Sequence, residues 1–192
     1  MTDTPMNPMN KAMNPTEPLK PNTNGMLRLF VYGTLKRGFW NHDRFCRGVL
    51  TVEDALVRGR LFETSSGIPV LQVPEEDILT VGTIDPRTDA ATQAHVTVLM
   101  SNPEPTPDRH QKNATGGPWG PVYGELLTFD DPENRLPAID RLEGFHPGGP
   151  SLYRRVLVPV CMNRRKTLAV WVYIAGGNST DRFKSLPNGT WR

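Results

Sequence analysis

A short apolar segment that ends at a glycine constrains this chain more than any other feature of the sequence. Residues Leu27–Tyr32 first alternate apolar and basic side chains and then become continuously apolar, which is typical of a strand that enters a buried sheet. The segment stops at Gly33, where we expect a backbone conformation that a β-carbon forbids. Thr34 and Leu35 then lie on a turn whose N–H groups have no obvious ladder partner, and such a turn can bind an anion. The alternative is an ordinary strand followed by a glycine turn.

Several later segments have the same strand-like character with glycines inside them. Residues Ala55–Phe62 contain Gly59, and residues Gly120–Phe129 contain Gly124. A glycine inside a strand indicates a bulge or a close approach of another backbone. Further apolar runs predict strands at residues 68–73, 78–84, 95–100, 153–160 and 168–175.

The chain of 192 residues is long enough for one domain with tails. Residues 1–25 consist mainly of Met, Asn, Pro and Thr without apolar periodicity, so we expect a disordered N-terminal extension. The domain is predicted over residues 26–180, with a long loop excursion at 85–120 that is rich in Pro, Gly and charge in its second half. Residues 181–192 are predicted to form a polar C-terminal tail with Phe183, Leu186 and Trp191 as anchors.

Composition excludes several classes of protein. The formal net charge of +2 gives no indication of a nucleic-acid partner. No apolar run approaches the roughly 20 residues that a membrane helix needs, and no apolar signal-peptide region is visible at the N-terminus. We therefore expect a cytoplasmic protein. Cys46 and Cys161 are far apart and His42 has no second ligand at a suitable spacing, so no metal site is expected.

A helix is predicted after the strand at Gly120–Phe129. Leu136, Ile139 and Leu142 follow one another at steps of three, which gives the helix one apolar face. A proline suits a first helical turn, so the regular part is expected to begin near Pro137. The helix is predicted to end at Gly144.

Glu143 is the candidate catalytic residue because of its place at the end of this helix. The negative end of the helix dipole and burial would both raise the pKa of its carboxyl. Asp140 is three residues back and would disfavour the charge further. A carboxyl with a raised pKa can both accept and donate a proton near neutral pH. The alternative is a solvated glutamate at a helix end.

Five segments, in this order, resemble the γ-glutamylcyclotransferase-like family, which includes AIG2-like proteins and γ-glutamylamine cyclotransferases. The resemblance covers roughly residues 27–175. It implies an α+β fold, a small mixed β-barrel with flanking helices, in agreement with the glycine-interrupted strands. The five segments are Val31–Gly38 with Asn41 and His42 after it, Arg58–Phe62, Val122–Leu126, Ile139–Gly144 and Tyr153–Arg155.

The resemblance also implies roles for individual residues. In the family, the loop that corresponds to Tyr32, Gly33, Thr34 and Leu35 holds the γ-glutamyl part of the substrate through backbone groups. The glutamate that corresponds to Glu143 is the catalytic acid and base, and the tyrosine at Tyr153 lines the cavity. Ile139 stands where leucine is commoner, and the excursion at 85–120 is longer than is typical, which leaves the specificity for the leaving group open.

The function expected from these residues is a cofactor-independent cyclotransferase, an acyl-transfer or lyase-type enzyme without a metal ion. It would close a small-molecule γ-glutamyl amide to 5-oxoproline and release an amine. Two alternatives remain open: the same ring closure on a γ-glutamyl intermediate bound to a carrier protein, for which Arg164–Lys166 is a thin hint of a docking face, or a non-catalytic binding module on the same fold. The sequence fixes neither the amine, nor the pathway, nor the oligomeric state.

Overall fold

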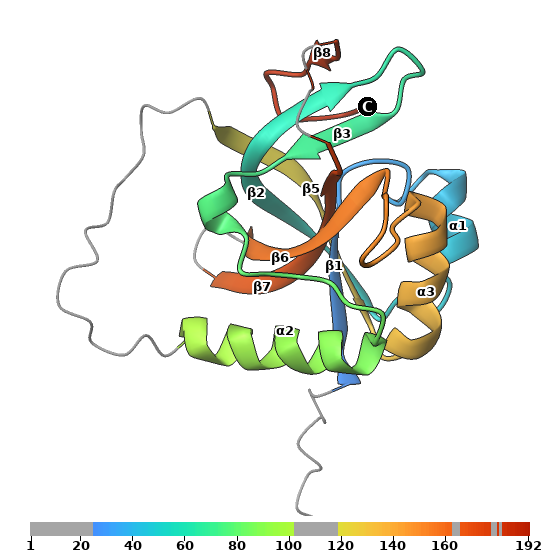
Figure 1. Cartoon of the computed structure of the whole chain (residues 1–192), viewed down its shortest axis with the longest axis vertical. Coiled ribbons are helices and arrows are strands. Elements are labelled where there is room, and N and C mark those ends of the chain that lie inside the picture. Colours follow the sequence, from blue (N-terminus) through green and yellow to red (C-terminus); the bar gives the residue numbers. More distant parts are fainter. Residues whose placement is uncertain (1–24, 102–118, 163–165, 178–179, 181) are drawn as a thin grey trace, which may run out of the picture.

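The fold is built on a closed five-stranded barrel (Figure 1). The computed structural model describes residues 25–101, 119–162, 166–177, 180 and 182–192. Within the barrel β1 (Leu27–Val31) lies between β5 (Gly120–Phe129), which is antiparallel to it, and β7 (Lys166–Ala175), which is parallel. The neighbours β2 (Thr51–Glu63) and β6 (Tyr153–Met162) pair with β5 and β7 and, through Ala55 to Val57, with each other. This last pairing closes the ring, and the predicted small mixed β-barrel is confirmed.

Three short strands extend the barrel at its edges. Strand β3 (Pro69–Gln72) and strand β8 (Lys184–Ser185) both pair with the C-terminal half of β2, and β4 (Thr80–Val81) pairs with β6. A short 3-10 helix, Glu75–Asp77, precedes β4. The strand expected at residues 78–84 is therefore limited to two residues.

Three α-helices flank the barrel in the described part of the chain. They are α1 (Trp40–Phe45), α2 (Pro86–Ser101) and α3 (Pro132–Glu143). Helices α1 and α3 contact each other on one side of the barrel, and α2 packs across β7, β1 and α3 (Figure 1). Among the described helices, none is long and apolar enough to cross a membrane.

The core has two parts, and β1 lies between them with both of its faces buried. Phe30 and Tyr32 belong to the cluster that fills the barrel, whereas Leu29 and Val31 belong to a second cluster between the barrel and the helices. Successive side chains of a strand point to opposite faces. The continuous apolar run that ends at Gly33 therefore reflects a strand that separates two cores.

Helix α2 corrects the expectation for residues 85–120. The predicted strand at 95–100 and the loop character of residues 86–101 are both wrong, because Pro86–Ser101 form a helix; residues 102–118 lie outside the described part of the chain. The buried positions of this helix include Asp89 and Gln93. Gln93 exchanges two hydrogen bonds of 2.8 Å with the backbone of Arg28. A helix that attaches through polar groups lacks the apolar periodicity from which helices are recognised.

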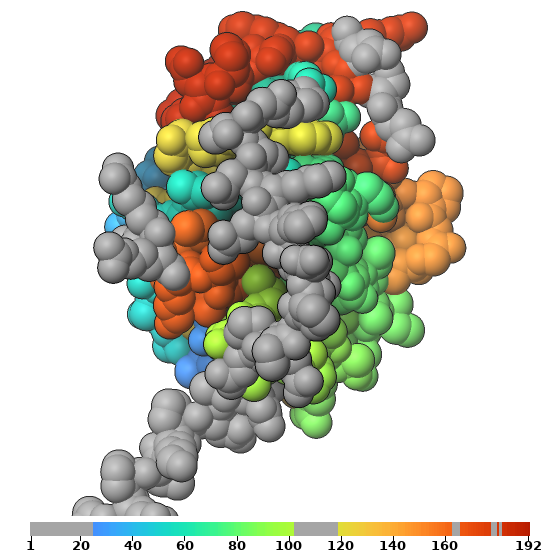
Figure 2. All heavy atoms as spheres, turned by 90° about the vertical axis from the view of Figure 1, so that its left-hand side faces the viewer, coloured from blue at the N-terminus to red at the C-terminus, as the bar shows by residue number. Residues whose placement is uncertain are grey.

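The C-terminal residues belong to the fold rather than to a tail. They lie at the opposite end of the molecule from α2, at the top of both views (Figures 1 and 2). Trp191 is buried, its ring stacks on Phe39 at 5.3 Å, and its indole N–H donates to Glu63 at 3.1 Å. The predicted anchors Leu186 and Trp191 are confirmed, and the boundary expected at residue 181 is wrong. The predicted N-terminal extension lies outside the described residues, apart from Gly25.

We predict that Trp191→Ala lowers the free energy of unfolding by about 3–5 kcal/mol, because removing a buried aromatic side chain leaves a cavity in the barrel core. The matched control is Trp40→Ala, since Trp40 is 63% exposed and should change the stability by far less. Urea denaturation of the two variants and the wild type provides the measurement. Equal, small losses for both tryptophans would show that the C-terminal residues do not contribute to the core.

Candidate active site

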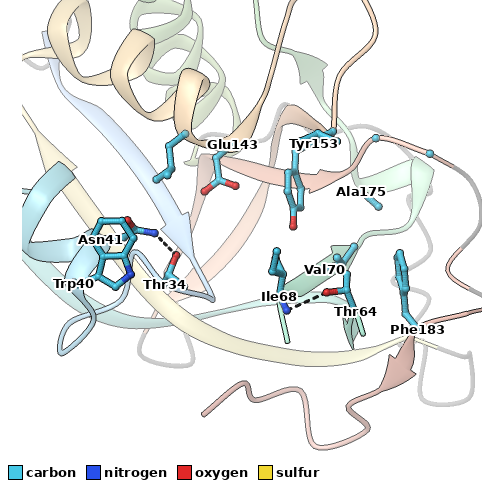
Figure 3. Close-up of a pocket in the computed structure, with 14 residues that line it drawn as sticks. Thr34, Trp40, Asn41, Thr64, Ile68, Val70, Glu143, Tyr153, Ala175 and Phe183 are labelled. Carbon is cyan, nitrogen blue, oxygen red and sulfur yellow. Dashed lines mark hydrogen bonds between the residues drawn. The ribbon is translucent and has the colours of Figure 1, made fainter. Parts of the chain in front are cut away.

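A cavity of about 620 Å³ opens beside the C-terminal end of α3 (Figure 3). A smaller recess of about 60 Å³ adjoins it and is lined by the turn after β1. The two spaces share Thr34, Ile68, Glu143 and Tyr153 among their lining residues. All the residues that the sequence singled out as a site line one or both spaces: Tyr32, Gly33, Thr34, Leu35, Glu143 and Tyr153.

The end of α3 fixes the position of Glu143. The helix stops at Gly144 as predicted, in a left-handed conformation with φ of 61°. A β-carbon at Gly144 would also lie 2.9 Å from the side chain of Leu152. Pro132 occupies the first turn and Pro137 lies inside the helix, so the expected start near Pro137 is wrong. The Glu143 side chain points from the last turn of α3 into the cavity (Figure 3).

The Glu143 carboxyl has an unusual affinity for protons. Burial, and then the nearby carboxyl of Asp140, raise its pKa from 4.5 to about 7. Burial and the proximity of Glu143 likewise raise the pKa of Tyr153 to about 12. Near neutral pH the carboxyl is therefore divided between its protonated and ionised forms, which is what a group needs in order to accept and return a proton. The Tyr153 hydroxyl stays protonated and donates to the carbonyl of Pro69 at 3.1 Å.

A buried ion-pair network lies behind Glu143. Asp140 accepts a hydrogen bond of 2.6 Å from the Tyr173 hydroxyl and lies 3.0 Å from Nε of Arg155. Nη2 of the same guanidinium is 2.9 Å from Asp89 on α2. Burial raises the pKa of Asp140, and the guanidinium of Arg155 opposes that effect. The network joins α2, α3, β6 and β7 and holds a carboxyl close to Glu143.

The turn after β1, Gly33–Leu35, lines the recess and has backbone N–H groups without a backbone partner among the described residues. The N–H of Lys36 donates to the carbonyl of Gly33 at 3.0 Å and closes the turn. In the part of the chain that the structure describes, the N–H groups of Gly33, Thr34 and Leu35 donate to no backbone carbonyl. Tyr32 is buried, and its hydroxyl donates to the Tyr173 carbonyl at 2.8 Å. The phenol thus attaches the turn to the barrel, and the unengaged N–H groups remain for an anion or an oxyanion.

Gly33 is required for a different reason from the one expected. Its φ lies outside the left-handed region, so the expectation of a forbidden backbone conformation is wrong. A β-carbon at this position would instead lie 2.7 Å from Cγ of the buried Pro69 on β3. Close packing of β3 against the turn is what excludes a side chain here. The distance between two segments that are 36 residues apart is not visible in a local sequence pattern.

Two side chains of α1 hold the turn after β1 in place. Asn41 is buried and donates to the Thr34 hydroxyl at 2.8 Å. Nδ1 of His42 lies 2.8 Å from the carbonyl of Leu35. Both residues follow the motif Val31–Gly38 in the sequence, and neither contact is predicted from the sequence. Their contacts hold the turn against α1.

The walls of the larger cavity are mostly apolar and were not predicted from the sequence. They come from separate segments: α1, β3 and the loop before it, the end of α3, the start of β6 and the loop before it, the end of β7 and the C-terminal residues. In the described part of the chain, no group of three or more His, Cys, Asp or Glu residues is placed to hold a metal ion. The apolar members of the wall are Trp40, Ile68, Val70, Leu142, Leu152, Ala175 and Phe183.

Comparison with known proteins gives one family match. The model of the family described as "Gamma-glutamyl cyclotransferase, AIG2-like" matches residues 29–94 and 89–192. No match was found among curated proteins. Three solved structures resemble the chain at low identity. YkqA from Bacillus subtilis has 20% sequence identity, with a TM-score of 0.47; the match covers 86% of this chain and 39% of YkqA. An uncharacterized protein from Pyrococcus horikoshii has 16% identity and a TM-score of 0.47, and the match covers 86% of this chain and 89% of that protein. An AIG2-like protein from Mus musculus has 18% identity and a TM-score of 0.46, and the match covers 87% of this chain and 88% of that protein.

The raised pKa of Glu143 has a consequence for stability. Since the folded protein binds this proton more tightly than the unfolded chain does, ionisation of Glu143 lowers the free energy of unfolding as the pH rises from about 4.5 through 7. We predict that Glu143→Gln is more stable than the wild type at pH 8, by up to about 3 kcal/mol, with most of this difference gone at pH 4.5.

Denaturant unfolding at both pH values provides the measurement. Glu133→Gln, an exposed glutamate in the first turn of the same helix, is the control and should show no comparable gain at pH 8. If Glu143→Gln is no more stable at pH 8 than the wild type, the carboxyl is not held in an environment that disfavours its charge.

Proposed function

Because the chain belongs to the gamma-glutamyl cyclotransferase, AIG2-like family, we propose that it closes γ-glutamyl amides to 5-oxoproline with release of an amine. One observation supports this reaction above the others. The carboxyl of Glu143, with a pKa of about 7, shares a recess with the turn Tyr32–Leu35. A proton-transfer group and a turn whose N–H groups at residues 33–35 have no backbone partner in the described part of the chain therefore line the same small volume.

The reaction needs the substrate to be folded on itself. In a γ-glutamyl amide the α-nitrogen can reach its own γ-carbonyl carbon and close a five-membered ring. A site that holds the chain bent makes this attack intramolecular and removes much of the entropic barrier. The recess beside the turn is where we place the γ-glutamyl group, with its carboxylate or its developing oxyanion on the N–H groups of Gly33, Thr34 and Leu35.

One proton has to move for the reaction to balance. The neutral α-amine attacks the γ-carbonyl carbon, and the new carbon–nitrogen bond places a positive charge on the ring nitrogen. The carboxylate of Glu143 accepts a proton from that nitrogen. The bond to the leaving nitrogen then breaks as Glu143 returns the proton to it, which gives 5-oxoproline and a free amine. A single carboxyl with a pKa near 7 suits both steps.

The remaining residues position these groups in the proposed reaction. Tyr153 lines both spaces beside Glu143 and keeps its proton, with a pKa of about 12. Asp140 and Arg155 lie behind the carboxyl and hold the end of α3 to the barrel. No cofactor takes part in the reaction as written. A small-molecule substrate and a cytoplasmic location stay predictions. Of the basic segment Arg164–Lys166 considered for carrier-protein docking, residues 164 and 165 lie outside the described residues.

We predict that the purified chain releases 5-oxoproline from at least one γ-glutamyl amide and that Glu143→Gln lowers this turnover by about 10²–10⁴-fold. Glutamine keeps the size of the side chain and removes the titratable proton. Because the turn Tyr32–Leu35 is unchanged, the variant should still bind the substrate. Chromatographic detection of 5-oxoproline and calorimetric titration of the variant provide the two measurements.

Glu133→Gln, on the exposed first turn of α3, is the matched control and should retain wild-type turnover. A Glu143→Gln variant within a few-fold of the wild type would remove Glu143 from the reaction. A wild-type protein that is inactive on a broad panel of γ-glutamyl amides would instead favour a binding module on the same fold.

A further inference from the structure

The larger cavity extends well beyond the place given to the γ-glutamyl group. The recess beside the turn has about 60 Å³, whereas the adjoining space has about 620 Å³. Clefts of this larger size hold ligands with many more atoms than a glutamyl group. Figure 3 shows Thr34 and Asn41 on one side of Glu143, and Tyr153, Ala175 and Phe183 toward the other. With the γ-glutamyl group at the turn, the leaving amine would lie on the side of Phe183.

That side of the cavity is mostly apolar, and the hydroxyls of Thr64 and Tyr153 are its polar groups (Figure 3). Its walls include Ile68 and Val70 on and before β3, Leu152 before β6, and Phe183 in the C-terminal segment. Two of these side chains are exposed to an extent that is unusual for large aliphatic residues, Ile68 at 51% and Leu152 at 77%. Exposed apolar groups that converge on one cavity mark a place where a ligand is bound rather than a random feature of the surface.

The described lining of the cavity contains a carboxyl group but no basic side chain. None of its described lining residues is Lys, Arg or His. Arg44 lies over the ring of Trp40 at 5.9 Å, on the side of the turn, and is not part of the lining. Glu143 is the one lining group in the described residues that ionises near neutral pH. A second carboxylate on the leaving group would therefore lie near Glu143 without a cation to balance it, which is unfavourable in a partly buried site.

From these observations we propose that the leaving group is a bulky apolar amine without a carboxylate, such as an arylalkyl or branched alkyl amine, and that Ile68, Val70, Leu152 and Phe183 form its binding pocket. This inference rests on the proposed cyclotransferase function and specifies its substrate class. It excludes α-amino acids and peptides with a free carboxylate beside the scissile amide as good leaving groups.

Two substrates that differ by one carboxylate test the charge preference. γ-Glutamyl-phenethylamide and γ-glutamyl-phenylalanine carry the same aromatic side chain, and γ-glutamyl-methylamide lacks it. We expect kcat/KM for 5-oxoproline release to be highest for the phenethylamide and lower by about tenfold or more for each of the other two. Equal values for the phenethylamide and the phenylalanine derivative would overturn the proposal while leaving the cyclotransferase function intact.

Two variants test the location of the pocket. Phe183→Ala and Ile68→Ser should each lower the ratio of kcat/KM for the phenethylamide to that for the methylamide, by about three- to tenfold. Leu99→Ser is the matched control, since Leu99 is 57% exposed, lies on α2 and does not line the cavity. An unchanged ratio in both pocket variants would overturn the assignment of these residues.

A binding measurement separates the inference from the proposed chemistry. Calorimetric titration of Glu143→Gln with the phenethylamide and the methylamide reports on the apolar pocket without turnover, and independently of the charge at residue 143. Tighter binding of the phenethylamide, by about tenfold, supports the pocket even if no substrate releases 5-oxoproline. Equal affinities, or no binding of either compound, would overturn it. If the variant shows this binding preference but the wild type releases no 5-oxoproline, the proposed function is wrong and the pocket is still supported.

Discussion

The Arg155 guanidinium, buried between two carboxylates, is the interaction on which the rest of the structure depends. It lies 2.9 Å from Asp89 and 3.0 Å from Asp140, and it stacks against the rings of Phe145 and Trp171. Removing one partner of such a buried pair leaves an uncompensated charge and typically costs about 3–5 kcal/mol. Because the two aspartates come from α2 and α3, this guanidinium holds both helices to the barrel. The position of the last residue of α3, Glu143, follows from it.

The same arrangement explains why the candidate site is poised for proton transfer. The network supplies a carboxyl, Asp140, within electrostatic reach of Glu143, while the apolar cavity walls withdraw water from it. Both effects disfavour the charged form of Glu143, so the fold keeps a group that opposes its own stability at neutral pH. Groups of this kind cluster at functional sites, since a purely structural position would tolerate an amide or an apolar side chain. The turn after β1, braced by Asn41 and His42, completes the site from the other side.

Local sequence patterns predicted the parts of the fold that depend on local chemistry. The apolar run before Gly33 gave the central strand, Gly144 gave the end of α3, and the place of Glu143 before that glycine gave the direction of its pKa shift. Helix α2 was missed because Asp89 and Gln93 are among its buried residues, so no apolar stripe marks it. The packing of Pro69 on Gly33, and the walls formed by Leu152 and Phe183, depend on contacts between distant segments. No pattern within one segment contains such information.

The central claim is that Glu143 carries a proton near neutral pH because of where the fold places it. A ¹³C-NMR titration of the Glu143 side-chain carboxyl, assigned by comparison with Glu143→Gln, measures this property without a substrate. The account predicts a midpoint at about pH 7 in the wild type and a lower midpoint in Asp140→Asn, where the neighbouring carboxyl is removed. A midpoint near the ordinary glutamate value of about 4.3 in the wild type would contradict it.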